Sequence, residues 1–207
     1  MTATASTGGS GATAERWLAT GRAMQQAGRG ADACAALVEA IVAAPASDAA
    51  REALVLLRDV PGRDRTALDA AVLEGLRRVD DKVAFLARYG DYFMLDQRCY
   101  EAEGAYERAL AIHEQSADAW RGLGVAQRHL GRLDQALQAG LRAVEIDPGF
   151  VAGYEDLGDT LLARGDRKAA EDAFIRALSV DPRAPGARLG VGLLLEGQGA
   201  FADAEAC

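Results

Sequence analysis

Residues 117–150 read ADAWRGLGVAQRHLGRLDQALQAGLRAVEIDPGF, and residues 151–184 read VAGYEDLGDTLLARGDRKAAEDAFIRALSVDPRA. The two stretches share the same kind of residue at six places, and the members of each pair lie 34 residues apart. The pairs are Trp120 and Tyr154, Leu123 and Leu157, Gly124 and Gly158, Ala136 and Ala170, Ala143 and Ala177, and Pro148 and Pro182. A fixed period near this length indicates an array of repeated supersecondary units.

The same period continues beyond these two stretches. One more step forward reaches Gly192, Leu195 and Ala204, and one step back reaches Gly90, Ala102 and Ala109. Near the start of the chain, the internal spacing of residues 117–150 is repeated by Trp17, Gly21, Ala33, Ala40 and Pro45. We therefore expect a disordered tail over residues 1–13, then units at about 14–47, 48–82, 83–116, 117–150, 151–184 and 185–207. The unit 48–82 is divergent, and the last unit is incomplete.

Each unit is expected to fold as two antiparallel helices. In residues 117–130 the apolar positions fall three and four apart, which places them on one helical face and buries Trp120. Gly131 is a helix-stop signal, and a second periodic stretch runs over residues 134–146. Asp147 precedes a proline and is pushed out of helical geometry, so the second helix ends there. The sequence thus predicts an all-α fold.

Small residues recur where the helices are expected to meet. Glycine inside a helix lowers stability by about 0.5–1 kcal/mol relative to alanine, so a repeated helical glycine indicates a steric reason. The glycines concerned are Gly21, Gly90, Gly124, Gly158 and Gly192. We expect a side chain at these places to collide with the neighbouring helix.

At these positions the chain resembles the tetratricopeptide repeat family, and the resemblance covers nearly all of it after the first dozen residues. The resemblance implies a right-handed solenoid of tandem antiparallel helix hairpins, in which each hairpin contacts only its neighbours. Two residues depart from the family pattern. Gln127 replaces a large apolar residue, and Gly140 stands where Tyr106 and Phe174 stand in other units. We expect a looser core around these two positions.

The net charge and the residue composition indicate which classes of partner, which cellular compartment and which kind of genome to expect. The net charge is −8 at pH 7 and no basic stripe dominates, so we expect no nucleic-acid or anionic-membrane partner. Residues 1–13 lack the basic start and the apolar run of a signal peptide, which favours a cytoplasmic protein. Lys82 and Lys168 are the only lysines beside many arginines, a bias that favours a GC-rich, bacterial genome.

The sequence offers little material for catalysis, and we expect no enzyme activity, no metal site and no cofactor. His113 falls at the end of a second helix and is interpreted as a solvated cap, and His129 has no serine or cysteine partner in a recognisable catalytic arrangement. Cys34, Cys99 and Cys207 lie far apart, without the close spacing of a zinc site. We interpret the first two cysteines as small apolar residues of second helices.

In the tetratricopeptide family a concave face, lined mainly by the first helix of each unit, binds a protein or peptide. The candidate partner-binding residues on this face are Arg22, Arg88, Asp91, Arg121, Arg128, His129, Glu155, Asp156 and Asp159. Arginine can hold a carboxylate at two points, and the acidic residues suit a basic group on the ligand. The hypothesis is an extended peptide or partner helix with unlike charges at its two ends. The alternative is that these charges are ordinary solvated surface.

Two binding modes of the family are put in doubt. The clamp that grips the carboxylate tail of chaperones uses lysine and asparagine on consecutive first helices. The grip on peptide backbone in O-linked N-acetylglucosamine transferases uses a ladder of asparagines. Here the ladder places hold Gly122, Asp156 and Gly190, and the chain contains no asparagine. We expect a different partner.

The C-terminal unit supports two interpretations, because it stops within its second helix soon after Ala204. Repeat arrays need a polar terminal cap, and here the uncapped face would include Leu193, Leu194, Leu195 and Phe201. One interpretation is a free-standing, non-catalytic scaffold or adaptor whose exposed end forms a homodimer or binds a partner. The other is the N-terminal, substrate-presenting array of a longer enzyme, such as a glycosyltransferase-like protein.

Overall fold

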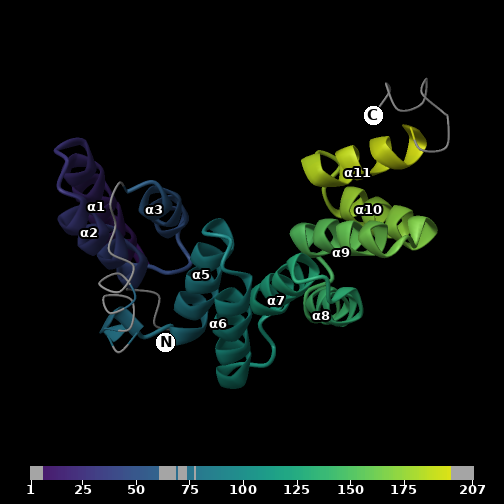
Figure 1. Cartoon of the computed structure of the whole chain (residues 1–207), viewed down its shortest axis with the longest axis horizontal. Helices are drawn as coiled ribbons and strands as arrows, with labels where there is room; N and C mark the ends of the chain where they lie inside the picture. Colours follow the sequence, from purple (N-terminus) through teal and green to yellow (C-terminus); the bar gives the residue numbers. More distant parts are fainter. Residues whose placement is uncertain (1–6, 61–68, 70–73, 77, 197–207) are drawn as a thin grey trace, which may run out of the picture. The chain divides into compact units, whose positions relative to one another are not determined.

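The computed structural model describes residues 7–60, 69, 74–76 and 78–196. Within this part of the chain the regular elements are all α-helices (Figure 1), which confirms the all-α prediction. The chain divides into two compact units, residues 1–112 and residues 113–207. Each unit is built from consecutive helices that pack on one another.

The unit 1–112 has its described helices at α1 Thr7–Gln26, α2 Gly30–Ala43, α3 Asp48–Arg58, α5 Lys82–Leu95 and α6 Cys99–Ile112. Helix α1 packs against α2, and α3 packs against both of them. Helices α5 and α6 form a further hairpin, and α5 also contacts α3 and α2. The largest fully buried side chains of this unit are Leu37, Leu57, Phe85, Leu86, Tyr92 and Tyr106.

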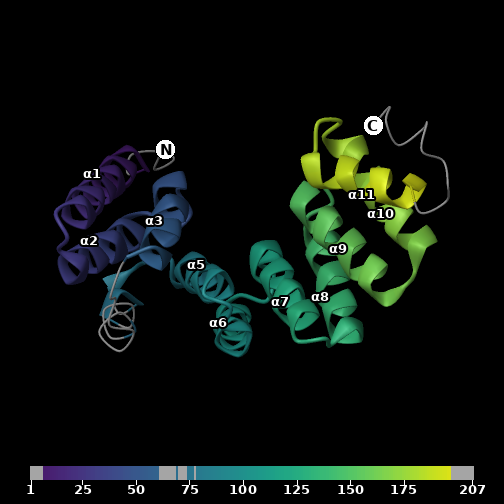
Figure 2. The same ribbon diagram turned by 45° about the horizontal axis from the view of Figure 1, so that its top comes forward.

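The unit 113–207 is a stack of helix hairpins over its described residues 113–196. Helix α7 (Ala117–His129) pairs with α8 (Leu133–Ile146), α9 (Val151–Arg164) pairs with α10 (Arg167–Val180), and α11 (Pro185–Glu196) follows. Helix α8 also packs against α9, and α10 packs against α11 (Figure 2). The first helices meet directly as well, α7 with α9 and α9 with α11. Tandem stacking of hairpins is therefore confirmed within this unit.

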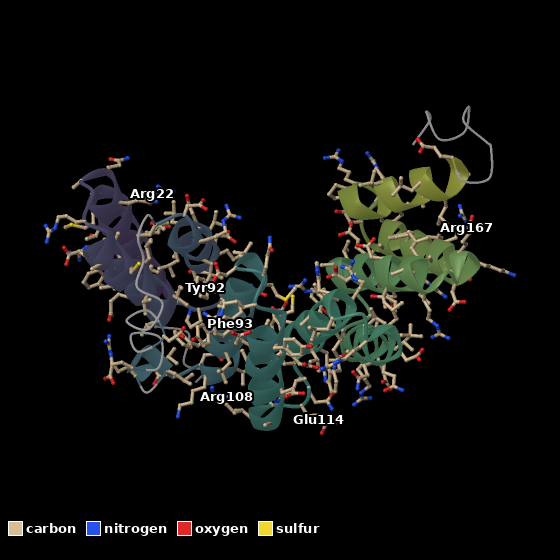
Figure 3. The ribbon with its side chains drawn as sticks, viewed as in Figure 1. Arg22, Tyr92, Phe93, Arg108, Glu114 and Arg167 are labelled. Atoms are coloured by element: carbon tan, nitrogen blue, oxygen red, sulfur yellow. The ribbon has the colours of Figure 1, made fainter. Side chains whose placement is uncertain are left out.

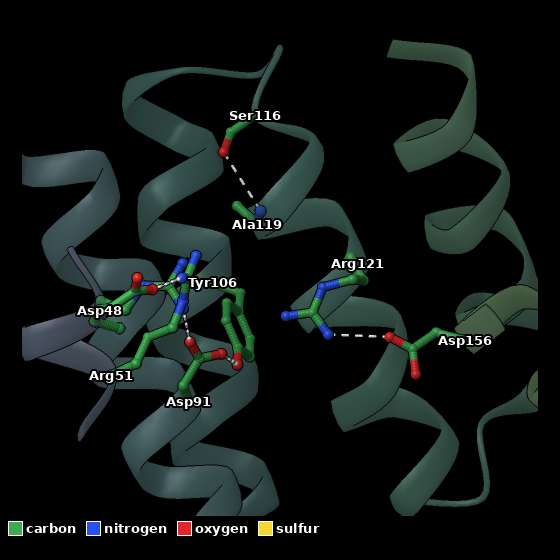
Figure 4. Close-up of polar contacts among 9 residues, drawn as sticks. Asp48, Arg51, Asp91, Tyr106, Ser116, Ala119, Arg121 and Asp156 are labelled. Atoms are coloured by element: carbon green, nitrogen blue, oxygen red, sulfur yellow. Dashed lines mark hydrogen bonds and ion pairs between the residues drawn. The ribbon is translucent and has the colours of Figure 1, made fainter. Parts of the chain in front are cut away.

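Local residues end and begin the helices, and Gly131 ends α7 as the sequence predicts. Gly131 and Gly165 follow α7 and α9 with φ of +76° and +93°, the left-handed region that glycine adopts without strain. At the start of α7, the Ser116 hydroxyl accepts a hydrogen bond from the backbone N–H of Ala119 at 3.3 Å (Figure 4). Gly131 and Gly165 each form the tight turn inside their hairpin, and the Ser116 cap fixes where α7 begins.

Most helical glycines lie where two helices meet. A Cβ atom on Gly158 would lie 2.5 Å from the Phe174 ring, and one on Gly190 would lie 2.4 Å from the same ring. Phe174 is 0% exposed, so its ring is enclosed between α9 and α11. Among the five repeated glycines of the sequence pattern, Gly192 is the exception, because nothing lies within 4 Å of its Cβ position. The predicted collision is confirmed at Gly158 and is wrong at Gly192.

The core near Gly140 is filled without an aromatic ring at that position. A Cβ atom on Gly124 would lie 3.2 Å from the carbonyl oxygen of Ala136, so the backbones of α7 and α8 approach closely. Leu157 of α9 comes within 3.2 Å of the Cβ position of Gly140, and Gln127 is buried. The expectation of a looser core is therefore wrong at this place, because the next hairpin supplies a leucine to fill it.

Two further expectations differ from the structure. Helix α1 begins at Thr7, so residues 7–13 of the expected disordered tail are helical, because the helix continues ahead of the buried Ala14. Residues 1–6 lie outside the described residues. Trp120 is only partly buried, because its indole Nε1 reaches the edge of the unit and donates to the carbonyl oxygen of Glu114 at 2.7 Å.

Candidate functional site

Charged side chains of α7 and α9 bind one another on the surface made by α7, α9 and α11, which we call the first-helix face. Arg121 Nη1 donates to Asp156 Oδ2 at 3.0 Å (Figure 4). Arg128 Nη2 lies 3.7 Å from Asp156 Oδ1 and 3.8 Å from Asp159 Oδ2. The two arginines and two aspartates therefore form one network that joins consecutive hairpins. Arg121, Arg128 and Asp156 keep about a quarter of their side-chain surface exposed.

Glu155 connects α9 to α11. Its Oε1 atom accepts a hydrogen bond from the backbone N–H of Ala187 at 2.9 Å. The first N–H groups of a helix have no partner within the helix, and a carboxylate there also interacts favourably with the helix dipole. Glu155 thus caps the start of α11 from the preceding hairpin.

Asp159 is the most exposed acid of this group, with 49% of its side-chain surface accessible. Partial burial raises the pKa of its carboxyl above the ordinary value, and the neighbouring charges of Asp156 and Glu155 raise it further. Arg128 acts in the opposite direction but does not cancel these effects. Helix α9 brings three acids to this surface, Glu155, Asp156 and Asp159, against the arginines Arg121 and Arg128 of α7. His129, the last residue of α7, is exposed.

The candidates in the unit 1–112 have partners of their own. Arg22, which Figure 3 labels on α1, pairs with Glu52 of α3. Arg88 is 8% exposed, and its Nη1 donates to Asp91 Oδ2 at 2.5 Å. The other oxygen of Asp91 accepts from the Tyr106 hydroxyl at 2.7 Å (Figure 4). Arg88 and Asp91 therefore hold α5 to α6, and the burial of Arg88 removes it from the expected lining.

Within one unit, the structure brings together five of the sequence-predicted residues: Arg121, Arg128, Glu155, Asp156 and Asp159. The sequence-based hypothesis left these charges free for a ligand and missed that they pair with each other. The available signal was their spacing, since Arg121 and Asp156 lie 35 residues apart, one more than the repeat. Positions one repeat apart lie side by side on stacked helices. That this network binds a partner stays a prediction.

Helix α11 presents apolar side chains that the sequence-based reasoning only partly identified. Leu189 and Leu193 are 66% and 51% exposed, and Leu189 was not among the residues expected there. Leu194, which was expected on the exposed end, is only 2% exposed because it packs in the core formed with α9 and α10. At the start of α10, Arg167 (Figure 3) donates to the Leu194 carbonyl oxygen at 3.4 Å. Phe201 lies outside the described residues.

The described residues include no cluster of three or more histidine, cysteine or acidic side chains that could hold a metal ion. His113 is exposed, Cys34 is buried and Cys99 is partly buried, whereas Cys207 lies outside the described residues. In the described part of the chain, no helix combines the length and the apolar character needed to cross a bilayer.

Sequence comparisons match the chain to a known repeat. A family model described as tetratricopeptide repeat matches residues 90–149 and 155–206. The Hsp70-Hsp90 organizing protein of Triticum aestivum is 29% identical over 94 residues, which cover 45% of this chain and 16% of that protein. The match thus spans less than a fifth of the length of that relative.

Solved structures with the same fold are similar as well. MamA has a TM-score of 0.59 at 23% identity, covering 68% of this chain and 82% of that chain. The first TPR of Spaghetti (RPAP3), bound to the HSP90 peptide SRMEEVD, has a TM-score of 0.55 at 17% identity, covering 58% and 99%. The Sgt2 TPR domain from Aspergillus fumigatus has a TM-score of 0.54 at 18% identity, covering 56% and 78%.

At these identities the structural likeness concerns the fold. The family model, by contrast, matches more than half of the residues, and it does so over the hairpins that repeat with a fixed period. The chain belongs to the tetratricopeptide repeat family.

Proposed function

We propose that this chain is a non-catalytic protein-interaction scaffold that binds an extended peptide or a partner helix on the first-helix face of the unit 113–207. The observation that carries the proposal is the network of Arg121, Arg128, Asp156 and Asp159, whose side chains remain partly exposed on two consecutive first helices. Membership of a family of protein-binding repeats supports it.

The internal pairing changes what this face offers a ligand. Separate basic and acidic stretches would suit a ligand with unlike charges at its ends, but here Asp156 already joins Arg121 to Arg128. A guanidinium has five N–H donors, so an arginine with one carboxylate partner keeps donors for another. Arg128 has its carboxylate partners beyond 3.5 Å. A ligand group can therefore join the network at Arg128 without displacing Asp156.

The chaperone-tail mode is not part of this proposal. One similar solved structure holds an HSP90 peptide, and the wheat relative is named for Hsp70 and Hsp90. The clamp of that mode uses lysine and asparagine, and this chain contains no asparagine. The places of the family's asparagine ladder hold Gly122 and Gly190, which are buried and have no side chain to donate, and Asp156, which pairs with Arg121. None of the relatives described above is named for a transferase, so no observation favours the array of a longer glycosyltransferase-like enzyme.

The test uses the full chain as bait in a pull-down, with partners identified by mass spectrometry. Arg128→Glu should abolish capture of the specific partner, because the added carboxylate repels Asp156 and Asp159 and opens the network. The matched control is Arg176→Glu, the same change at an exposed arginine on α10, outside the first-helix face. Circular dichroism should show equal helicity for both variants. Loss of the partner with both variants, or with neither, would remove the first-helix face as the binding surface.

A further inference from the structure

Helix α11 carries an exposed apolar stripe. Leu189 and Leu193 lie one helical turn apart and are the most exposed leucines of the helix, at 66% and 51%. The adjacent side of α11, about 100° around the helix from Leu193, is packed, since Ala187 and Leu194 are buried. Residues three and seven positions after Gly186 share its helical face, so the two leucines continue the line that begins at Gly186.

This stripe adjoins the carboxylates of α9. The Cβ position of Gly186 lies 2.8 Å from Cδ of Glu155, and the same carboxylate caps the first turn of α11. Helices α9 and α11 run in the same direction, because the single antiparallel helix α10 connects them. Asp159 lies one turn further along α9, and the leucines lie one and two turns further along α11. The leucines and the α9 acids therefore share the first-helix face.

Two acidic side chains, Asp159 and Glu196, lie on the same face as the leucine pair, whereas Arg167 of α10 is held at the Leu194 carbonyl oxygen on the buried side of α11. Glu196 follows Leu193 by three residues on the same stripe and is exposed. Asp159 is half exposed, and its raised pKa reports repulsion among the α9 acids in addition to partial burial. The nearest arginine on α11 is Arg188, whose guanidinium donates to the Pro182 carbonyl oxygen at 2.7 and 3.1 Å and is held at the start of the helix.

We propose that the Leu189–Leu193 stripe and the adjoining acids of α9 bind an extended, cationic protein segment with apolar residues at alternate positions. One helical turn separates the two leucines by about 6 Å along the helix axis. In an extended chain, side chains two residues apart point the same way and lie about 6.6 Å apart. Two alternate apolar side chains therefore match the two leucines, and a basic residue at either end meets Asp159 or Glu196. This inference rests on the proposed function and names the partner's chemistry.

The probe is the fluorescein-labelled peptide Arg-Ser-Leu-Ser-Leu-Ser-Arg with blocked ends, titrated with the full chain in a fluorescence anisotropy assay. We expect it to bind about tenfold more tightly than a copy with both arginines replaced by glutamate. A copy with both leucines replaced by serine should lose about as much affinity. Raising the salt concentration should weaken the charge preference, since exposed charges are screened.

Variants of the chain locate the surface. Leu189→Ser with Leu193→Ser should weaken the probe about tenfold. The matched control is Leu141→Ser with Ile175→Ser, two equally exposed aliphatic residues on the second helices α8 and α10. Asp159→Asn should weaken the probe and reduce its preference over the glutamate copy. Equal affinity for the glutamate copy, or equal losses in the control variant, would overturn the proposal.

Two alternative occupants of the leucine stripe, a segment of the same chain and a second copy of the chain, can be distinguished by further measurements on these variants. If the chain covers its own leucines, the Leu189 and Leu193 variant should melt well below the Leu141 and Ile175 control. If a second copy covers them, light scattering should show a dimer that the first variant converts to a monomer. Either result would overturn the proposal. The proposed function survives independently if capture of the partner depends on Arg128 but not on the leucines.

Discussion

Replacing Gly158 with alanine tests whether consecutive hairpins are held in contact by an aromatic ring seated between two glycines. The new methyl group would lie 2.5 Å from the Phe174 ring, whereas carbon atoms in contact lie about 3.5–4.0 Å apart. Phe174 is fully buried and also meets Gly190 of α11, so the ring has no free side toward which it can move. The substitution must therefore push α9 away from α10 or distort the ring's rotamer.

The magnitude follows from two opposing effects. Overpacking a full core typically destabilises by about 1–3 kcal/mol, and the enclosed ring places Gly158→Ala at the upper end. Alanine gains about 1 kcal/mol over glycine in a helix interior. The expected net loss is about 2 kcal/mol, which lowers the melting temperature by roughly 4–8 °C for a chain of this size. The assay is thermal unfolding followed by circular dichroism, with urea unfolding to give the free energy.

Gly192→Ala is the matched control, because Gly192 is also helical and nothing lies within 4 Å of its Cβ position. This variant should be unchanged or stabilised by up to about 1 kcal/mol. In a Phe174→Leu background, Gly158→Ala should be less damaging by about 1–2 kcal/mol, because the colliding ring is gone. If both alanine variants raise the melting temperature alike, the packing argument is refuted.

The remaining predictions concern α7 and α9. Ser116→Ala removes the side-chain cap of α7 and should lower the free energy of unfolding by about 1 kcal/mol in urea titration, whereas no change would mean that the cap is replaced by water. Trp120→Ala should lower it by about 2 kcal/mol, below the 3–5 of a fully buried aromatic, because Trp120 is partly exposed; a larger loss would contradict that exposure. Asp159 has a raised pKa, so folding favours its protonated form, and folding weakens as the pH rises from the unfolded-state pKa of about 3.9 through the folded-state pKa. Asp159→Asn should therefore melt higher than the wild type at pH 7, and the difference should vanish as the pH falls below about 3.9. If Asp159→Asn melts lower than the wild type at pH 7, the ionised Asp159 stabilises the fold and the prediction is contradicted.

The helix hairpins could be predicted from the sequence because the residues that specify them act locally and recur in each repeat. Gly131 ends a helix for a backbone reason that needs no tertiary context, and Gly158 indicates a close helix contact wherever helices stack. Gly192 shares the same repeat position but lacks a neighbour in the described residues, since α11 has no described hairpin partner after it. Repetition predicts the position, while the contact depends on what packs there.

The candidate site was only partly predictable, because charge pairing depends on which helices become neighbours. Arg121 and Asp156 could be placed on first helices from the pattern, but their ion pair requires the register between α7 and α9. Leu194 was misjudged for a related reason. A run of leucines does not reveal which member points inward, and one residue of rotation separates the buried Leu194 from the exposed Leu193.

Hydroxyl-radical footprinting of the chain, alone and with its captured partner, tests the first-helix face most directly. Leu189 and Leu193 on α11 have matched controls in Leu141 and Ile175, exposed aliphatic residues on the second helices. Binding on the first-helix face should suppress oxidation of the α11 leucines and leave the two controls unchanged. Protection of Leu141 and Ile175, with the α11 leucines still oxidised, would place the partner on the opposite side of the hairpins and contradict the account.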